Sequence, residues 1–337
     1  MFGTYRFILA LLVVMQHFKL PFPGPVGNYA VAAFYVLSGY LMTLVLNEKY
    51  QGIQGTAHFL VNRALRIYPS YLVVALFTLF FVYFEPNIAW KFYKSIIMPQ
   101  TVGDWLTNLT IMGLWKTNHI ILVPQGWTLF VELFYYVVMT LLSRNRVVTA
   151  GWFIASLVWT GTALYIGMSF EDRHATITAA SLHFSTGAMI YHYGQKVGRW
   201  LWTGPALAYG AIILTAKPPH GGAPYYLSIL AAALLIMTLR DKRSKRWDSF
   251  LGDLSYPMYL SHFAVGILIS KLFFGHAALR SYPYFLIYLF YIIVFSYILH
   301  RYVEKPINGI RERVKIGDRR IRSAELLPVG RSDARTV

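Results

Sequence analysis

The chain contains no cysteine and few charged residues. None of its 337 residues is Cys, and Asp, Glu, Lys and Arg together make up 13% of them. The missing thiols exclude cysteine nucleophiles, disulfides and thiolate metal sites. A soluble domain carries about twice this fraction of charged residues. A composition that is 56% hydrophobic and 17% aromatic therefore indicates a polytopic membrane protein.

Motifs for metals, nucleotides and nucleic acids are also missing. The 10 histidines show no His-Glu-x-x-His or similar pairing with carboxylates, so we expect no metal site. No Gly-rich phosphate loop or dinucleotide loop appears, so we expect no bound cofactor. The net charge of +17 lies mostly in loops predicted to be cytoplasmic, where insertion orientation and anionic lipid explain it. We therefore expect the lipid bilayer as a partner and no nucleic acid.

Apolar runs of membrane-spanning length predict an all-α, polytopic transmembrane helical bundle of about ten spans. Basic connections such as Arg240–Arg246 alternate with poorly charged ones such as 171–174 if both termini are cytoplasmic. Residues 85–126 then form an outside excursion, whose apolar piece 105–115 is too short to cross. The expected spans are 4–20, 28–46, 68–84, 127–143, 148–167, 175–193, 200–216, 224–239, 254–274 and 283–303.

Two regions follow from this pattern. Residues 1–310 form the membrane-embedded domain. Residues 311–337 are basic and polar, and we expect them to form a disordered cytoplasmic tail.

The first apolar run contains Arg6 and His17, eleven positions apart. On an α-helix this is about three turns, so both side chains lie on one face, about 16 Å apart along the axis. Ionisable groups inside a span are costly and usually functional. The structural alternative is that Arg6 extends to the headgroups while His17 caps the helix end near Lys19.

Glu132 is the acidic residue placed well within an expected span, in the same outer half as His17. A buried carboxylate and a buried imidazole would relieve each other's desolvation cost by meeting. We therefore expect Glu132 and His17 to form a pair. The alternative is that each is satisfied separately by backbone or hydroxyl groups.

One further residue and two further pairs carry polar chemistry. Arg63 and Arg66 share a helix face and suit phosphate binding, although a positive-inside anchor is the ordinary explanation. Ser38, next to Gly39, suits close helix packing better than a nucleophile. Ser255 and His262 are seven positions apart, which is too far for a catalytic dyad, so structural or ligand-contacting roles are expected.

Six segments occur in a characteristic order. They are RFILALLVVMQH (6–17), AFYVLSGYLM (33–42), RALRIYPSYL (63–72), WTLFVELFYY (127–136), LGDLSYPMYLSH (251–262) and VEKP (303–306). Together they resemble the acyltransferase 3 family of integral-membrane O-acyltransferases, which modify bacterial surface and exported saccharides. The resemblance covers about residues 1–310. Ala32 stands where many members carry a polar residue, which bears on acceptor choice.

The resemblance implies an acyl-CoA co-substrate, most simply acetyl-CoA, and a saccharide or glycolipid acceptor. It implies a multi-pass protein of the bacterial inner (cell) membrane. His17 and Glu132 correspond to catalytic residues, with His17 as general base or transient acyl carrier. Arg6, Arg63 and Arg66 correspond to acyl-CoA-binding residues. Residues expected to line the substrate site are Ser38, Tyr136, Ser255 and His262.

A transporter or flippase for a saccharide or lipid-linked carrier is the alternative function. A Glu and a His inside apolar spans would also serve proton coupling. Against this, no repeat relates the two halves of the sequence. A transporter has no need of CoA phosphates, so removing the charges of Arg63 and Arg66 would leave transport intact and abolish acyl-CoA-dependent labelling in an enzyme.

Overall fold

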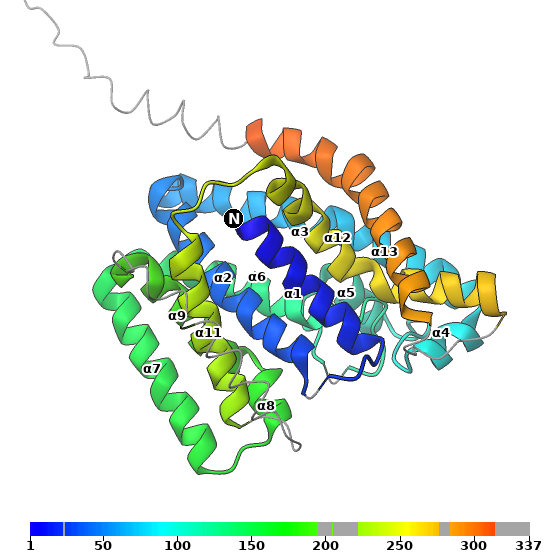
Figure 1. The fold of residues 1–337 in the computed structure, drawn as a ribbon, viewed down its shortest axis with the longest axis horizontal. Helices are drawn as coiled ribbons and strands as arrows, with labels where there is room; N and C mark the ends of the chain where they lie inside the picture. The colour runs from blue at the N-terminus through cyan, green and yellow to red at the C-terminus, as the bar shows by residue number, and fades with distance from the viewer. Residues whose placement is uncertain (23, 117, 195–203, 205–221, 276–283, 314–337) are drawn as a thin grey trace, which may run out of the picture.

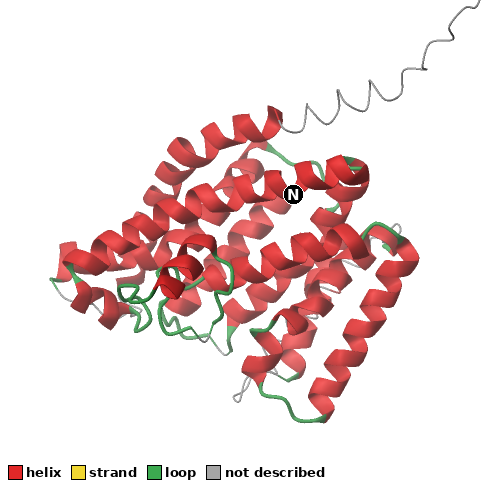
Figure 2. Ribbon diagram, turned by 180° about the vertical axis from the view of Figure 1, so that it is seen from behind, coloured by secondary structure: helices red, strands yellow, loops and turns green. Residues whose placement is uncertain are grey.

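The computed structural model describes the whole chain except residues 23, 117, 195–203, 205–221, 276–283 and 314–337. All regular secondary structure in the described part is helical (Figures 1 and 2). The all-α fold is therefore confirmed. The expected span 200–216, apart from Gly204, and the tail from 314 onward lie outside the described residues.

Most helices follow the expected apolar runs. The described elements are α1 (Phe2–His17), α2 (Val26–Glu48), α3 (Gly52–Phe84), α4 (Pro86–Phe92), α5 (Val102–Thr110), α6 (Gly126–Leu142), α7 (Arg146–Tyr165), α8 (Phe170–His174), α9 (Ile177–Tyr193), α11 (Ala223–Leu239), α12 (Arg246–Ile269), η2 (Ser270–Phe274), α13 (Phe285–Leu299) and η4 (His300–Glu304).

Five of the described helices are long and apolar enough to cross a membrane. They are α2, α3, α7, α12 with its continuation, and the helix over Phe285–Arg313, whereas α1, α6 and α11 are apolar but shorter. The number of spans and the side of the termini stay predictions.

Helix α3 corrects one expectation. The expected spans 28–46 and 68–84 leave a connection between them that ends near Pro69, but α3 is one helix of 33 residues with Pro69 in its interior. A proline there leaves the carbonyl of Leu65 without its helical N–H partner. Both residues line a small polar cavity together with Ser70. Polar surroundings make such an interruption tolerable inside a membrane helix, so the helix continues.

Glycines allow two pairs of helices to approach closely. A Cβ at Gly187 of α9 would lie 2.1 Å from the carbonyl oxygen of Val36 on α2, and one at Gly39 would lie 2.3 Å from that of Phe184. A Cβ at Gly3 of α1 would similarly meet the backbone of α12. Small residues at such contacts let membrane helices pack backbone to backbone. The expected packing role is therefore confirmed for Gly39.

The basic connections gather at one end of the bundle. The Arg144 guanidinium donates to the carbonyl of Tyr50, 2.9 Å away, and so joins the segments that follow α6 and α2. The N-terminal amine donates to the carbonyl of Lys242. Figure 1 shows the N-terminus on the same side as the described end of the chain, beyond α13. The side of the membrane that this end faces stays a prediction.

The excursion over 85–126 lies at the opposite end. Its two helices, α4 and α5, have 7 and 9 residues, too few to span a bilayer. The Phe92 ring at the end of α4 contacts the rings of Phe18, just beyond α1, and Phe263 of α12. The excursion therefore covers the end of the bundle at which α1 finishes with His17.

Candidate active site

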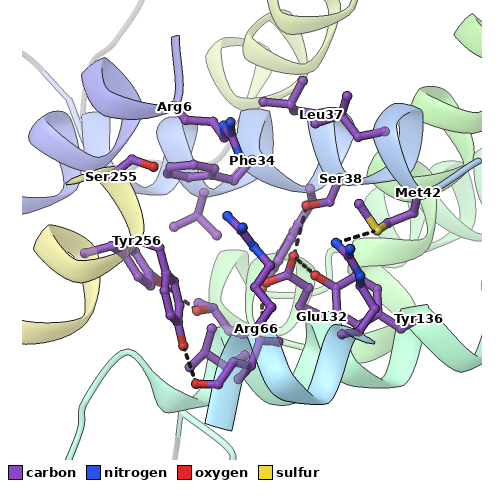
Figure 3. Close-up of a pocket in the computed structure, with 18 of the residues that line it drawn as sticks. Arg6, Phe34, Leu37, Ser38, Met42, Arg66, Glu132, Tyr136, Ser255 and Tyr256 are labelled. Atoms are coloured by element: carbon purple, nitrogen blue, oxygen red, sulfur yellow. Dashed lines mark hydrogen bonds between the residues drawn. The ribbon is translucent and has the colours of Figure 1, made fainter. Parts of the chain in front are cut away.

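A cavity of about 280 Å³ opens between α1, α2, α3, α6 and α12. Figure 3 shows Arg6 and Arg66 extending into it from different helices, with Ser38, Glu132 and Tyr136 along another wall. Seven of the nine residues assigned a role from the sequence and its family resemblance line it. These seven are Arg6, Ser38, Arg63, Arg66, Glu132, Tyr136 and Ser255.

Positive charge dominates the cavity wall. Four of its lining residues are arginines and one, Glu132, is a carboxylate. None of the four arginines forms an ion pair with a carboxylate among the described residues. Buried charges are usually paired because desolvation is costly. An unpaired set of guanidinium groups in a cavity therefore indicates an anionic ligand.

Arg63 is the most deeply buried of these arginines, with 8% of its surface exposed. Its guanidinium donates to Oδ1 of Asn62 at 2.8 Å and lies over the Phe59 ring, 5.6 Å from its centre. Its Nε is buried and has no hydrogen-bond partner among the described residues. The alternative explanation, a surface anchor, does not describe Arg63, because the uninterrupted helix α3 carries it into the interior.

The fourth arginine, Arg311, was not selected from the sequence, which placed it in the tail. It lies on the helix that continues α13, and its guanidinium donates to Oδ1 of Asn62 on α3. Arg66 and Arg311 also line the small polar cavity beside Glu304. The sequence could have revealed Arg311 if the helix had been extended past VEKP (303–306), because Arg311 then lies on the same helix face as Glu304, two turns earlier.

Glu132 has two hydrogen-bond donors. Its Oε1 accepts from the hydroxyl of Ser38 at 3.0 Å and from the hydroxyl of Tyr136, one turn along α6. Ser38 thus binds a carboxylate rather than only packing. The expected pairing of Glu132 with His17 is wrong, because these two hydroxyls satisfy the carboxylate and His17 has a different partner. The structure shows the alternative for Glu132, in which hydroxyl groups form hydrogen bonds with the carboxylate.

His17 meets His262 instead. The Nδ1 atom of His17, the last residue of α1, lies 2.8 Å from Nε2 of His262 on α12. His17 is half-buried, whereas His262 is 0% exposed. Ser255 lies two turns earlier on α12 and donates to the carbonyl of Gly252. Ser255 therefore faces the cavity, whereas His262 contacts His17.

One ring separates the cavity from the histidine pair. Tyr259 lines the cavity, its hydroxyl lies 2.6 Å from Oγ1 of Thr128, and its ring centre is 6.4 Å from that of His262. Gln125, 2% exposed, donates to the carbonyls of Tyr259 and Leu260. Neither His17 nor His262 lines the cavity, and Tyr259 links its wall to the histidine pair.

Fold and site together define a helical membrane protein with a basic internal cavity and a histidine pair beyond its inner end. The acyltransferase 3 family model, described as an acyltransferase domain, matches residues 4–301. The chain belongs to this family and is a membrane acyltransferase. Neither the curated proteins nor the solved structures provide a match.

Proposed function

We propose that the protein transfers an acyl group, most simply acetyl, from cytoplasmic acyl-CoA to a hydroxyl of a surface or exported saccharide or glycolipid at the bacterial inner membrane. The cluster of four unpaired arginines in a membrane-embedded cavity carries this proposal. Coenzyme A is a polyanion with a long, uncharged arm, so it matches a cavity lined by arginines and by apolar side chains such as Phe34 and Leu37. Guanidinium groups bind phosphate in two-pronged fashion.

The donor would lie along the bundle. Its phosphates would contact Arg63, Arg66 and Arg311, which come together where α3 meets the helix beyond α13. Its arm would extend past Ser38 and Glu132 toward Tyr259. The axial distance from Arg6 to His17, about 16 Å, is one that an extended pantetheine arm can bridge.

His17 would act as general base. It takes the proton of the saccharide hydroxyl while the oxygen attacks the thioester carbonyl. The C–S bond then breaks, and the CoA thiolate receives that proton from the imidazolium, so the products are the acylated saccharide and CoA. A two-step route through an acyl-His17 intermediate gives the same products and suits donor and acceptor on opposite sides of the membrane.

Glu132 contacts the cavity rather than His17, so its proposed role changes. A carboxylate that already accepts two hydroxyl hydrogen bonds can accept another from an amide N–H of the donor arm. Its charge also offsets part of the field of the four arginines. We therefore assign Glu132 to donor binding and leave proton transfer to His17.

The test uses the purified, detergent-solubilised chain with acetyl-CoA labelled in the acetyl group and a crude surface saccharide. The variants are His17→Ala and, as a matched control, His119→Ala, which changes an exposed histidine of the excursion. We expect wild type and His119→Ala to consume acetyl-CoA and His17→Ala to lose at least about 10²-fold in rate. Label retained on the wild-type protein favours the two-step route.

Two results would count against the proposal. If His17→Ala consumes acetyl-CoA as fast as wild type, the role of His17 is wrong. If neither wild type nor the control turns over, a carrier for saccharides becomes the better explanation and vesicle transport assays decide.

A further inference from the structure

We propose that His262 is a positioning residue that fixes the proton of His17 on Nδ1 and so keeps the lone pair on Nε2 for proton transfer. The use of that lone pair rests on the proposed function, whereas the placement of the proton follows from the hydrogen bonds.

The tautomer of His262 is set by its own helix. Its Nδ1 lies 2.8 Å from the carbonyl oxygen of Tyr259, one turn earlier on α12. A carbonyl oxygen only accepts hydrogen bonds, so Nδ1 of His262 must carry the proton. In a neutral imidazole the other nitrogen then holds the lone pair, which makes Nε2 of His262 an acceptor.

Gln125 is compatible with this tautomer. Its amide nitrogen lies 2.7 Å from the carbonyl of Tyr259, 3.0 Å from Nδ1 of His262 and 3.1 Å from the carbonyl of Leu260. An amide nitrogen has two hydrogens, and the two carbonyls can accept both. The 2.8 Å contact of Nδ1 with the Tyr259 carbonyl decides the tautomer, because two acceptors would repel each other at that distance.

The acceptor on His262 then determines His17. Their facing nitrogens are 2.8 Å apart, and the ring centres are 5.0 Å apart with planes inclined by 17°. With so short a nitrogen contact, this centre separation is that of rings meeting edge to edge, which aligns an N–H with a lone pair. His17 must therefore donate from Nδ1, and Nε2 carries its lone pair.

This arrangement also suits the charged state of His17. When His17 takes a proton it becomes an imidazolium that still donates from Nδ1, and the hydrogen bond to His262 becomes charge-assisted and stronger. The same histidine therefore orients the base and stabilises the charge that forms on it. A neutral partner does this without leaving a permanent charge in the membrane.

The test reads the tautomer directly and then the kinetics. The full chain is labelled with ¹⁵N-histidine, and the His17 signals are identified by their loss in His17→Gln. Two variants separate hydrogen bonding from packing. His262→Phe keeps a ring without an acceptor, and His262→Gln places an amide oxygen near the position of Nε2.

We expect wild type to show a protonated Nδ1 and an unprotonated Nε2 on His17. In His262→Phe the proton should move largely to Nε2, the preference of free histidine, and kcat should fall about 10²-fold or more with the KM for acetyl-CoA unchanged. His262→Gln should restore the Nδ1 proton and at least about tenfold of the lost kcat. A residue that only filled space would be replaced better by Phe than by Gln.

His183→Phe is the matched control. His183 is also buried, with Nδ1 against a carbonyl one turn earlier and Nε2 against the hydroxyl of Tyr225, so its loss should leave the His17 tautomer unchanged. A protonated Nε2 on wild-type His17, or an unchanged kcat in His262→Phe, overturns the inference. Absence of turnover in every form would instead count against the proposed function, and the ¹⁵N spectra would still decide the tautomer.

Discussion

Replacing Arg66 with glutamine removes one positive charge from the cavity with little other disturbance. Arg66 lines the cavity from α3, is half-buried, and forms no hydrogen bond or ion pair with any other described residue. Arg63, in contrast, bonds to Asn62 and lies over Phe59. A change in ligand affinity on replacing Arg66 therefore reports on the ligand, whereas replacing Arg63 also removes packing.

A charge-assisted hydrogen bond is worth about 1.5–3 kcal/mol, so one lost phosphate contact should raise the Kd for acetyl-CoA about 10- to 150-fold. The assay is calorimetric binding to the purified chain, repeated with S-acetyl-pantetheine, which has the same thioester arm and no phosphate. The loss should appear with acetyl-CoA and vanish with S-acetyl-pantetheine. It should also shrink at high salt, because screening weakens exposed phosphate contacts.

Arg313→Gln is the matched control for Arg66→Gln. Arg313 is exposed and lies on the same helix as Arg311, but it does not line the cavity. The control removes the same charge from the same end of the bundle and should leave both affinities within about twofold, since exposed charges contribute little. Equal losses for the two ligands in Arg66→Gln, or no loss for either, would refute the assignment of this cavity to the CoA phosphates.

Three further outcomes are expected. Glu132→Gln keeps an oxygen that can accept the N–H of the donor arm and removes the charge that offsets the field of the arginines. It should therefore tighten acetyl-CoA binding by about 1 kcal/mol, or about fivefold; weaker binding would contradict this. Gly187→Ala should destabilise the protein by about 1–3 kcal/mol or more in thermal unfolding, because a Cβ there meets the backbone of α2, whereas Gly151→Ala, with open space around it, should not. Burial lowers the pKa of His174 in α8 to about 3, whereas the pKa of an unfolded histidine is about 6.5. The buried neutral imidazole therefore contributes stability above pH 6.5, and this stability is lost as the pH falls below that value. The melting temperature should therefore fall between pH 7 and pH 5, and fall less in His174→Gln.

Helical periodicity and the cost of charge in lipid were enough to predict the class and much of the cavity. Arg6 and Glu132 are ionisable residues within expected spans, and both line one cavity. Such residues avoid lipid and turn inward, so their convergence follows from the sequence, whereas Arg63 lay outside the expected spans and was selected for its arginine pair and the family resemblance. The boundary near Pro69 could not be predicted, because a proline is tolerated where a polar cavity surrounds the carbonyl that it leaves unpaired.

Contacts between distant helices were the part that sequence reasoning missed. His17 and His262 are 245 positions apart, and their meeting depends on the close packing of α1 against α12 that Gly3 and Gly252 allow. A rule that pairs a lone acid with a lone base favoured Glu132 instead. The rule failed because it ignores hydroxyls, which are common in these helices and satisfy Glu132 without a base.

The separation of the arginines from His17 has a chemical reason under the proposed function. A general base becomes positively charged as it works, and a guanidinium about 4 Å away would oppose that charge by about 4 kcal/mol at an effective dielectric constant of 20. At about 16 Å, the axial distance from Arg6 to His17, the same repulsion is about 1 kcal/mol. The long arm of the donor makes this separation usable, because it lets the phosphates bind where positive charge is needed while the thioester reacts where positive charge would be harmful. The neutral His262 at the reacting end and the unpaired arginines at the binding end are thus two consequences of one requirement.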